Sequence, residues 1–200
     1  MTLYLGSASP ARKQILEGLG HSNVVCCPSN VDETLSQEER THEEYVMEIT
    51  RRKTDAVLSD KLKGMDFVAE DYLVCGDCVV VNDNNEVYGK PASAEQALSW
   101  LHGYSGTCFY LVQALEVTHL ATRRRVVGTE RTTCWLDQIP LEGRVDYIND
   151  SGALGAAGGL IIEHPFIEPC IRSIQHGTKE SIMGLSPQLI QELFQKLTVS

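Results

Sequence analysis

A candidate phosphate-binding turn lies near the N-terminus, in the segment Gly6-Ser7-Ala8-Ser9-Pro10-Ala11-Arg12-Lys13. It follows Leu3 to Leu5, an apolar run that predicts a buried strand, and Ser9-Pro10 is typical of a helix N-cap and first helical residue. Such a turn presents backbone N–H groups and the positive end of the helix to an anion. Arg12 adds a planar guanidinium that can donate two hydrogen bonds to phosphate oxygens. An ordinary capped turn with surface basic residues is the alternative.

Two acidic positions could hold a metal ion or orient a water molecule. Asp32-Glu33 follows the second expected strand, and Asp77 lies in a polar break between two apolar runs. Carboxylates at strand ends are typical oxygen ligands of Mg²⁺ and typical general bases. Because its neighbours are apolar, Asp77 should be partly buried and its charge compensated. A plain turn aspartate is the alternative.

Two lysines could add positive charge to the same site. Lys53 lies on a long expected helix, and Lys90 lies in the constrained turn Gly89-Lys90-Pro91, which could aim its ammonium group inward. A solvated surface lysine is the alternative for each of them. The turn is not a Walker P-loop, because Pro91 stands where that motif has Ser or Thr.

Cysteine usage points to reduced thiols. The chain has seven Cys residues, an odd number that includes the adjacent pair Cys26 and Cys27, which predicts a cytoplasmic location. Cys75 and Cys78 match C-x-x-C, but an apolar strand rather than a helix follows them and no second C-x-x-C completes a zinc set. Thiol or zinc chemistry is therefore only a weak alternative.

Composition limits the classes of partner. A chain of 200 residues with 42% hydrophobic and 22% charged residues predicts one globular domain, residues 1–200. The 17 basic and 27 acidic residues give a net charge of -10, which excludes a nucleic-acid polymer as the expected partner but not a small anion held in one place. No stretch of 18 apolar residues predicts a membrane helix.

The remaining segments alternate between helical and extended patterns. Thr41 and Glu44 form a capping box for a helix that continues to about Leu62. The other expected elements are strands at Val24 to Cys27, Tyr72 to Cys75, Val79 to Val81, Val87-Tyr88, Thr107 to Leu120, Val126 to Leu136 and Leu160 to Glu163, and helices at Ser93 to Gly103, Leu141 to Ile148 and from Pro187 onward. This order predicts an α/β fold with a mixed sheet.

In this order the segments resemble the Maf family. The family pattern has a Ser-x-Ser-Pro-x-Arg opening, an acidic residue, a helix Lys, a strand-end Asp, a Gly-Lys-Pro turn, an Ala-Gly-Gly segment and a closing motif. The matching positions here are Ser7 to Arg12, Glu33, Lys53, Asp77, Gly89-Lys90-Pro91, Ala157-Gly158-Gly159 and Ser181 to Leu185. No single piece is specific, but the ordered set spans most of the chain.

The resemblance implies an inosine-triphosphatase-like fold, with a mixed, bent β-sheet flanked by helices in two lobes around a central cleft, and commonly a homodimer. It implies an enzyme that hydrolyses a nucleoside triphosphate to the monophosphate and pyrophosphate, with a divalent metal, as house-cleaning of the nucleotide pool. Mg²⁺ is the metal expected, with Mn²⁺ or Co²⁺ as alternatives. A nucleotide-binding regulator of septation without turnover is the alternative function.

The resemblance also assigns roles by matching position. Four residues would hold the triphosphate, Glu33 and Asp77 would bind the metal, and Asp77 would accept the proton of the attacking water. The four phosphate-binding residues are Ser7, Arg12, Lys53 and Lys90.

Three positions that bear on substrate choice depart from the family pattern. Ala11 and Cys78 stand where the thymidine- and uridine-triphosphate subgroup has Arg and Thr, and Glu163 stands where it has Gln. Glu163 resembles the subgroup that acts on 7-methylguanosine triphosphate, but Ala11 and Cys78 fit neither pattern.

Overall fold

The computed structural model describes residues 1–31 and 40–198, apart from the side chain of Thr198. The chain divides into two compact units. The first unit comprises Met1–Cys78, Gln113–Glu130 and Gly184–Ser200, and the second comprises Val79–Val112 and Arg131–Met183. Glu33, the expected metal ligand, lies outside the described residues.

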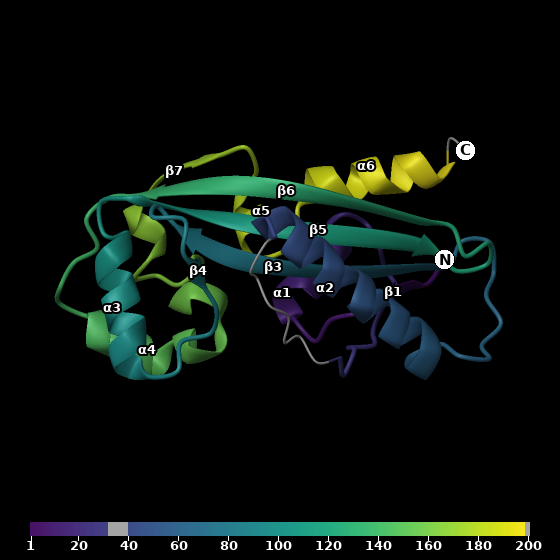
Figure 1. The fold of residues 1–200 in the computed structure, drawn as a ribbon, viewed down its shortest axis with the longest axis horizontal. Coiled ribbons are helices and arrows are strands. Elements are labelled where there is room, and N and C mark those ends of the chain that lie inside the picture. Colours follow the sequence, from purple (N-terminus) through teal and green to yellow (C-terminus); the bar gives the residue numbers. More distant parts are fainter. Residues whose placement is uncertain (32–39, 199–200) are drawn as a thin grey trace. The chain divides into compact units, whose positions relative to one another are not determined.

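Within the described residues, seven strands form a sheet in the order β2-β1-β3-β5-β6-β7, with β4 paired to β3 (Figure 1). β1 pairs in parallel with β2 and β3, whereas β4 pairs with β3 and β7 pairs with β6 in the antiparallel sense. The mixed sheet predicted from the sequence is thus confirmed. The bounds are β1 Leu3–Leu5, β2 Val24–Cys26, β3 Tyr72–Asn82, β4 Val87–Tyr88, β5 Cys108–His119, β6 Arg125–Leu136 and β7 Ile171–Gln175.

The helices of the first unit begin at the caps that the sequence predicts. α1 (Pro10–Gly18) starts after Ser9, whose side chain accepts a hydrogen bond from the Arg12 amide. α2 (His42–Ala56) starts after the capping box of Thr41 and Glu44 and continues into one π-helical turn, η1 (Val57–Lys61). α6 spans Pro187–Thr198. Local side-chain chemistry therefore fixes where α1 and α2 begin.

The second unit carries shorter helices. α3 (Ala94–Tyr104) is capped by Ser93, and α4 spans Arg144–Asp150. The Gly-rich stretch forms two short 3₁₀ helices, η2 (Ala153–Gly155) and η3 (Ala157–Gly159). A third 3₁₀ helix, η4 (Glu168–Cys170), and the single turn α5 (Lys179–Ile182) flank β7.

Two strand predictions were wrong. Tyr72 to Val81 is one continuous strand, because Gly76 and Asp77 stay within β3 instead of breaking it. Glycine at position 76 leaves room for the Leu115 side chain, since a Cβ there would lie 2.6 Å from Leu115 Cδ2. The expected strand Leu160 to Glu163 is irregular, and it follows two glycines with positive φ, Gly158 and Gly159, whose left-handed backbone cannot continue into a strand ladder.

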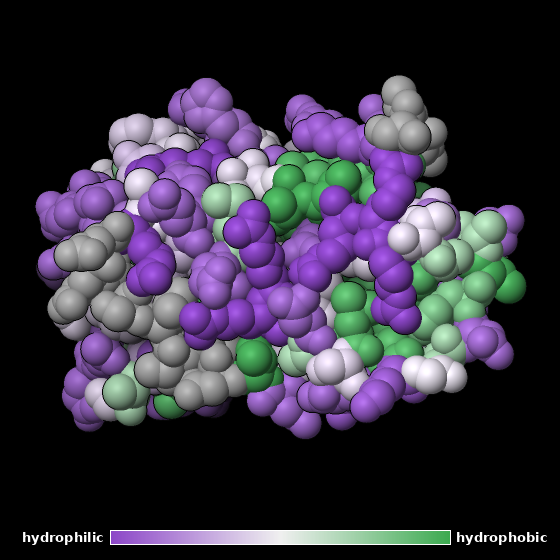
Figure 2. Space-filling view, turned by 45° about the vertical axis from the view of Figure 1, so that its right-hand side comes forward, coloured by the Kyte–Doolittle hydropathy of each residue, from purple (hydrophilic) through white to green (hydrophobic). Residues whose placement is uncertain are grey.

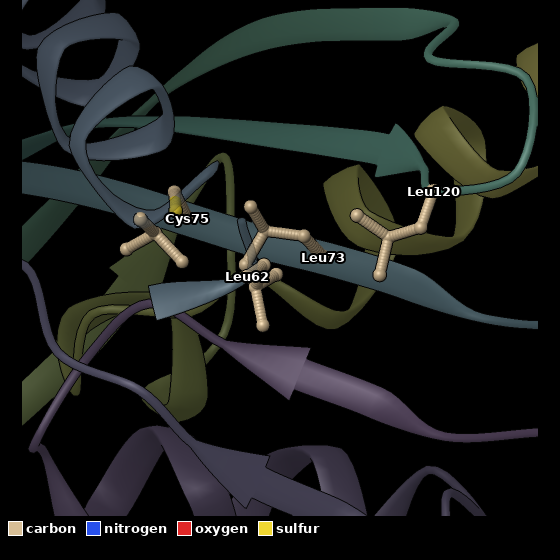
Figure 3. Packing of buried hydrophobic residues seen from close by; sticks show 5 residues of the cluster. Leu62, Leu73, Cys75 and Leu120 are labelled. Carbon is tan, nitrogen blue, oxygen red and sulfur yellow. The ribbon is translucent and has the colours of Figure 1, made fainter. Parts of the chain in front are cut away.

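A buried cluster of the first unit packs between η1, β3 and β5 (Figure 3). It consists of Val57, Leu62, Leu73, Cys75 and Leu120, each at most 2% exposed. Burial of such side chains stabilises a fold by about 1.5–3 kcal/mol each. The cluster anchors β3 and the C-terminal end of α2, the two elements that carry Asp77 and Lys53.

Hydrophilic side chains cover much of the face seen in Figure 2, and hydrophobic patches lie between them. This agrees with a chain in which 22% of the residues are charged. None of the described helices combines the length and the apolar character that crossing a membrane requires.

Candidate active site

The turn between β1 and α1 packs closely on β3. The Gly6 amide donates to the Val74 carbonyl at 2.8 Å, and a Cβ at Gly6 would lie only 2.3 Å from Cys75 Sγ. Only glycine allows this approach. Beyond it, Ser7 Oγ accepts a hydrogen bond from the Ser9 amide at 3.2 Å. The hydroxyl hydrogen of Ser7 can still donate to another acceptor, as the predicted phosphate contact requires.

Arg12 lies at the centre of this site, but it is engaged by the protein. Its Nη1 donates to the Gly76 carbonyl at 2.8 Å and its Nε to the Gly184 carbonyl at 2.9 Å. Nη2 makes a weak contact of 3.5 Å with Cys78 Sγ. A guanidinium has five N–H donors, so three contacts leave donors for an anion. Arg12 therefore braces the middle of β3 while remaining able to bind phosphate.

Lys53 and Asp77 form an ion pair between α2 and β3. Lys53 Nζ donates to Asp77 Oδ1 at 2.7 Å, and their side chains are 11% and 13% exposed. A carboxylate in the middle of a strand would be costly without such a partner. The prediction that Asp77 is partly buried and compensated is confirmed, and the compensating group is the lysine that the sequence singled out.

The two cysteines of the C-x-x-C match do not converge. Both lie on β3, where residues three apart point to opposite faces of the strand. Burial raises the pKa of Cys75 to about 12. Burial also raises the pKa of Cys78, although the nearby Arg12 acts in the opposite direction. Neutral thiols on opposite faces argue against the thiol and zinc alternatives.

Of the three specificity positions, Ala11 and Cys78 belong to the first unit and Glu163 to the second. Ala11 is half-buried on α1, next in sequence to Arg12. Glu163 is exposed in the turn after η3. Lys90 is also exposed and also belongs to the second unit. Ser7, Ala11, Arg12, Lys53, Asp77 and Cys78 all belong to the first unit. Within it Arg12 contacts Cys78 and Lys53 pairs with Asp77. The roles assigned to these residues, and to Lys90 and Glu163, stay predictions.

One feature of the described residues bears on metal binding. Residues 1–31 and 40–198 contain no group of three or more His, Cys, Asp or Glu side chains that could hold a metal ion. Mg²⁺ in phosphate sites is often held by one or two carboxylates together with substrate phosphate oxygens. Asp77, the carboxylate described at this site, fits that kind of binding.

Sequence reasoning missed a polar network that positions the Gly184 carbonyl. Ser186 Oγ donates to Glu130 Oε2 at 2.6 Å, and the Ser186 amide donates to Gln113 Oε1 at 3.1 Å. These bonds hold the chain two residues after Gly184, which has a φ of 99° and accepts from Arg12. The closing motif at Ser181 to Leu185 was the available signal, but it did not reveal Glu130 or Gln113 as partners.

A model of the family described as Maf-like protein matches residues 2–197. The chain belongs to the Maf family. It is 30% identical to a dTTP/UTP pyrophosphatase of Agathobacter rectalis, over 98% of both chains. It is 31% identical to a dTTP/UTP pyrophosphatase of Thermomicrobium roseum, over 98% of this chain and 84% of the relative. It is 29% identical to a nucleoside triphosphate pyrophosphatase of Thermosynechococcus vestitus, over 96% and 92%.

Proposed function

We infer that this chain is a hydrolase that converts a nucleoside triphosphate to the monophosphate and pyrophosphate. Family membership supports this function, as do relatives that match nearly the whole chain and are named pyrophosphatases. The observation that carries it is the Lys53–Asp77 pair of 2.7 Å between α2 and β3, with Arg12 bound to the carbonyl of Gly76, the residue that precedes Asp77. It joins a carboxylate able to act as a base to cations able to hold phosphate.

The chemistry follows from these groups. A water molecule attacks the α-phosphorus and gives its proton to Asp77, which is a carboxylate when paired with Lys53. Lys53 and the remaining donors of Arg12 stabilise negative charge on the departing pyrophosphate. Ser7, held by the Ser9 amide, orients a phosphate oxygen. The site therefore provides a base and preorganised donors within one unit.

We also propose that a divalent metal assists, with Mg²⁺ favoured and Mn²⁺ or Co²⁺ as alternatives. Asp77 and Glu33 would hold it, together with phosphate oxygens. When bound, such an ion neutralises phosphate charge and withdraws electron density from the phosphorus. The proposal for Glu33 rests on its position in the family pattern.

Lys90 is proposed as a further phosphate-binding residue, and Ala11, Cys78 and Glu163 as specificity residues. The relatives named dTTP/UTP pyrophosphatases favour a pyrimidine triphosphate. Glu163 favours a guanine base instead, because a carboxylate accepts hydrogen bonds from its N–H edge. A homodimer and a cytoplasmic location complete the proposal.

One experiment tests the function and separates it from a regulator without turnover. Purified protein and Mg²⁺ are incubated with dTTP, UTP, the six other common ribo- and deoxyribonucleoside triphosphates and 7-methylguanosine triphosphate in water enriched in oxygen-18. We expect pyrophosphate release, with the label in the monophosphate, because water attacks the α-phosphorus. Release of orthophosphate and a nucleoside diphosphate would contradict the mechanism, and so would the appearance of the label in pyrophosphate. Tight binding without any product would favour the regulator.

A further inference from the structure

The second unit contains a hydrogen-bonded turn pair whose role the proposed reaction leaves open. Its parts are the Gly89-Lys90-Pro91 turn and η3, Ala157–Gly159. The Gly158 amide donates to the Gly89 carbonyl at 2.8 Å. The two motifs are far apart in the sequence, but they are bonded to each other.

Gly158 of η3 is required by its conformation and by close contacts, and Gly159 by its conformation. Gly158 has a φ of 67°, and a Cβ there would lie 2.7 Å from Tyr104 Oη and 2.9 Å from Val80 Cγ1. Gly159 has a φ of 66°, and a Cβ there would contact Pro91 Cγ at 3.6 Å. Gly159 therefore lies near Pro91, the residue that follows Lys90.

Two buried tyrosines also form hydrogen bonds with this turn. Tyr104 Oη donates to the Gly158 carbonyl at 3.0 Å, and Tyr147 Oη donates to the Gly159 carbonyl at 3.1 Å. Tyr147 Oη also accepts from the Ile161 amide at 2.8 Å. Tyr104 and Tyr147 are 1% and 2% exposed, so both hydroxyls make these bonds in an environment without competing water.

The consequence concerns Lys90, whose side chain is exposed. An exposed lysine is not positioned by packing, so the position of its backbone alone determines which region its ammonium group can reach. That backbone is restrained on both sides: Gly89 is bonded to Gly158, and the buried Pro91 limits the conformation of the residue before it.

We propose that Gly158, Gly159, Tyr104 and Tyr147 are positioning residues that hold Lys90 for the triphosphate. The inference rests on the proposed function, since it assigns Lys90 a phosphate to bind. It gives the Ala-Gly-Gly segment a role in affinity and turnover in addition to its role in the fold. A correctly placed cation loses much of its effect when it is displaced, and an error of about 1 Å can lower rates by about 10²-fold.

A double-mutant cycle tests this dependence. Gly158→Ala should lower kcat/KM about tenfold or more, mainly by raising KM, because its Cβ displaces the turn. Gly152→Ala is the matched control: Gly152 also has a positive φ, 77°, but a Cβ there meets nothing within 4 Å. It should change kcat/KM by less than about twofold. In a Lys90→Ala background, Gly158→Ala should have an equally small effect.

Tyr104→Phe provides a milder variant that removes one hydrogen bond without adding atoms, in case Gly158→Ala fails to fold. We expect a loss of about threefold in the parent and none with Lys90→Ala. The same variants are also compared by calorimetry for their affinity for inorganic triphosphate. This measurement depends neither on the preferred base nor on turnover. Losses that are equal with and without Lys90 overturn the inference, as does a Lys90→Ala variant that matches the parent. A parent that neither binds triphosphate nor releases pyrophosphate overturns the proposed function itself.

Discussion

The two units position their cations in different ways. In the first unit, Lys53 and Arg12 are held through their charged ends, Lys53 by a carboxylate and Arg12 by two carbonyl groups. In the second unit, Lys90 has an exposed side chain on a backbone held by glycines and tyrosines. A cation whose charge is engaged must exchange partners to act on a substrate. One held only by its backbone is free to reach for it.

Substitutions in the first unit should therefore change stability and chemistry together. The largest effect is expected for Asp77→Asn, which keeps the size of the side chain but removes its charge and basicity. kcat should fall by about 10²-fold or more, the usual scale for the loss of a general base. Affinity for triphosphate should stay or rise, because a negative charge is lost and Lys53 is released toward phosphate. Calorimetry and kcat, each in parent and variant, measure both effects.

The control for this prediction is Asp83→Asn, an exposed aspartate in the turn after β3. A surface turn aspartate changes stability by only about ±0.5 kcal/mol and should leave turnover at the parental level. Loss of both turnover and metal affinity in Asp77→Asn would reassign Asp77 as a metal ligand alone. Turnover near the parental level would refute its role as the base.

The second prediction separates stability from chemistry in the ion pair. Lys53→Met and Asp77→Asn should each lower the free energy of unfolding by about 1.5–3 kcal/mol, because each removes one charge of a mostly buried ion pair. The double variant should lose less than the sum, since the two single variants remove the same charge–charge interaction. Its turnover should stay as low as that of Asp77→Asn. Urea unfolding of the four proteins gives the coupling, and additive losses would show that the pair does not act as a unit.

The third prediction compares two arginines that donate to carbonyl groups, one in each unit. Arg12 bonds the carbonyls of Gly76 and Gly184, and Arg144 bonds those of Ile139 and Pro140. A lysine cannot span two acceptors with one planar group, so each Arg→Lys change should lower stability by about 1–2 kcal/mol.

Only Arg12→Lys should also raise KM for the triphosphate, because Arg144 has no part in the proposed site. Thermal unfolding and steady-state kinetics on both variants test this difference. A rise in KM for both, in proportion to lost stability, would mean that Arg12 acts only as a brace.

The sequence predicted the features that depend on neighbouring residues and missed those that depend on distant ones. Ser9-Pro10 and Thr41 with Glu44 begin helices as expected, because a cap forms within four residues. The position of Asp77 within a continuous strand was not predictable, because it depends on Lys53, which is 24 residues away. In the sequence alone, a polar residue between two apolar runs predicts a break in the strand, unless the residue that pairs with it is known.

The same limit explains why the carbonyl partners of Arg12 were not predicted and why the strand expected after the Gly-rich segment was wrong. The carbonyl partners of Arg12 are 64 and 172 residues away, so the residue type predicted a phosphate contact but not a brace. Leu160 to Glu163 has the composition of a strand, but Tyr147 bonds both the Gly159 carbonyl and the Ile161 amide. Those groups are already bonded and do not join a sheet.

The smallest effect concerns Asp71, a carboxylate of the first unit that is held by the backbone rather than by a side-chain cation. Its Oδ1 accepts from the Thr2 amide at 2.8 Å and its Oδ2 from the Val68 amide at 3.1 Å. Burial acts to raise the pKa of Asp71, but these amides and the positive N-terminus outweigh it, and the net pKa lies below the ordinary value. The ionised form is thus favoured in the folded chain.

A carboxyl group whose pKa is lower in the folded state stabilises the fold above its unfolded pKa, about 3.9, and this stabilisation is lost as the pH falls through the folded pKa. Asp71→Asn should therefore lower the free energy of unfolding by about 1 kcal/mol near neutral pH, where one amide loses a charged acceptor. The difference from the parent should shrink below about pH 4, because the parent then carries a neutral group too. Urea unfolding at both pH values measures the change. A difference that stays constant across this range would show that Asp71 acts through packing and not through its charge, and kcat should be unchanged in either case, since Asp71 lies outside the proposed catalytic set.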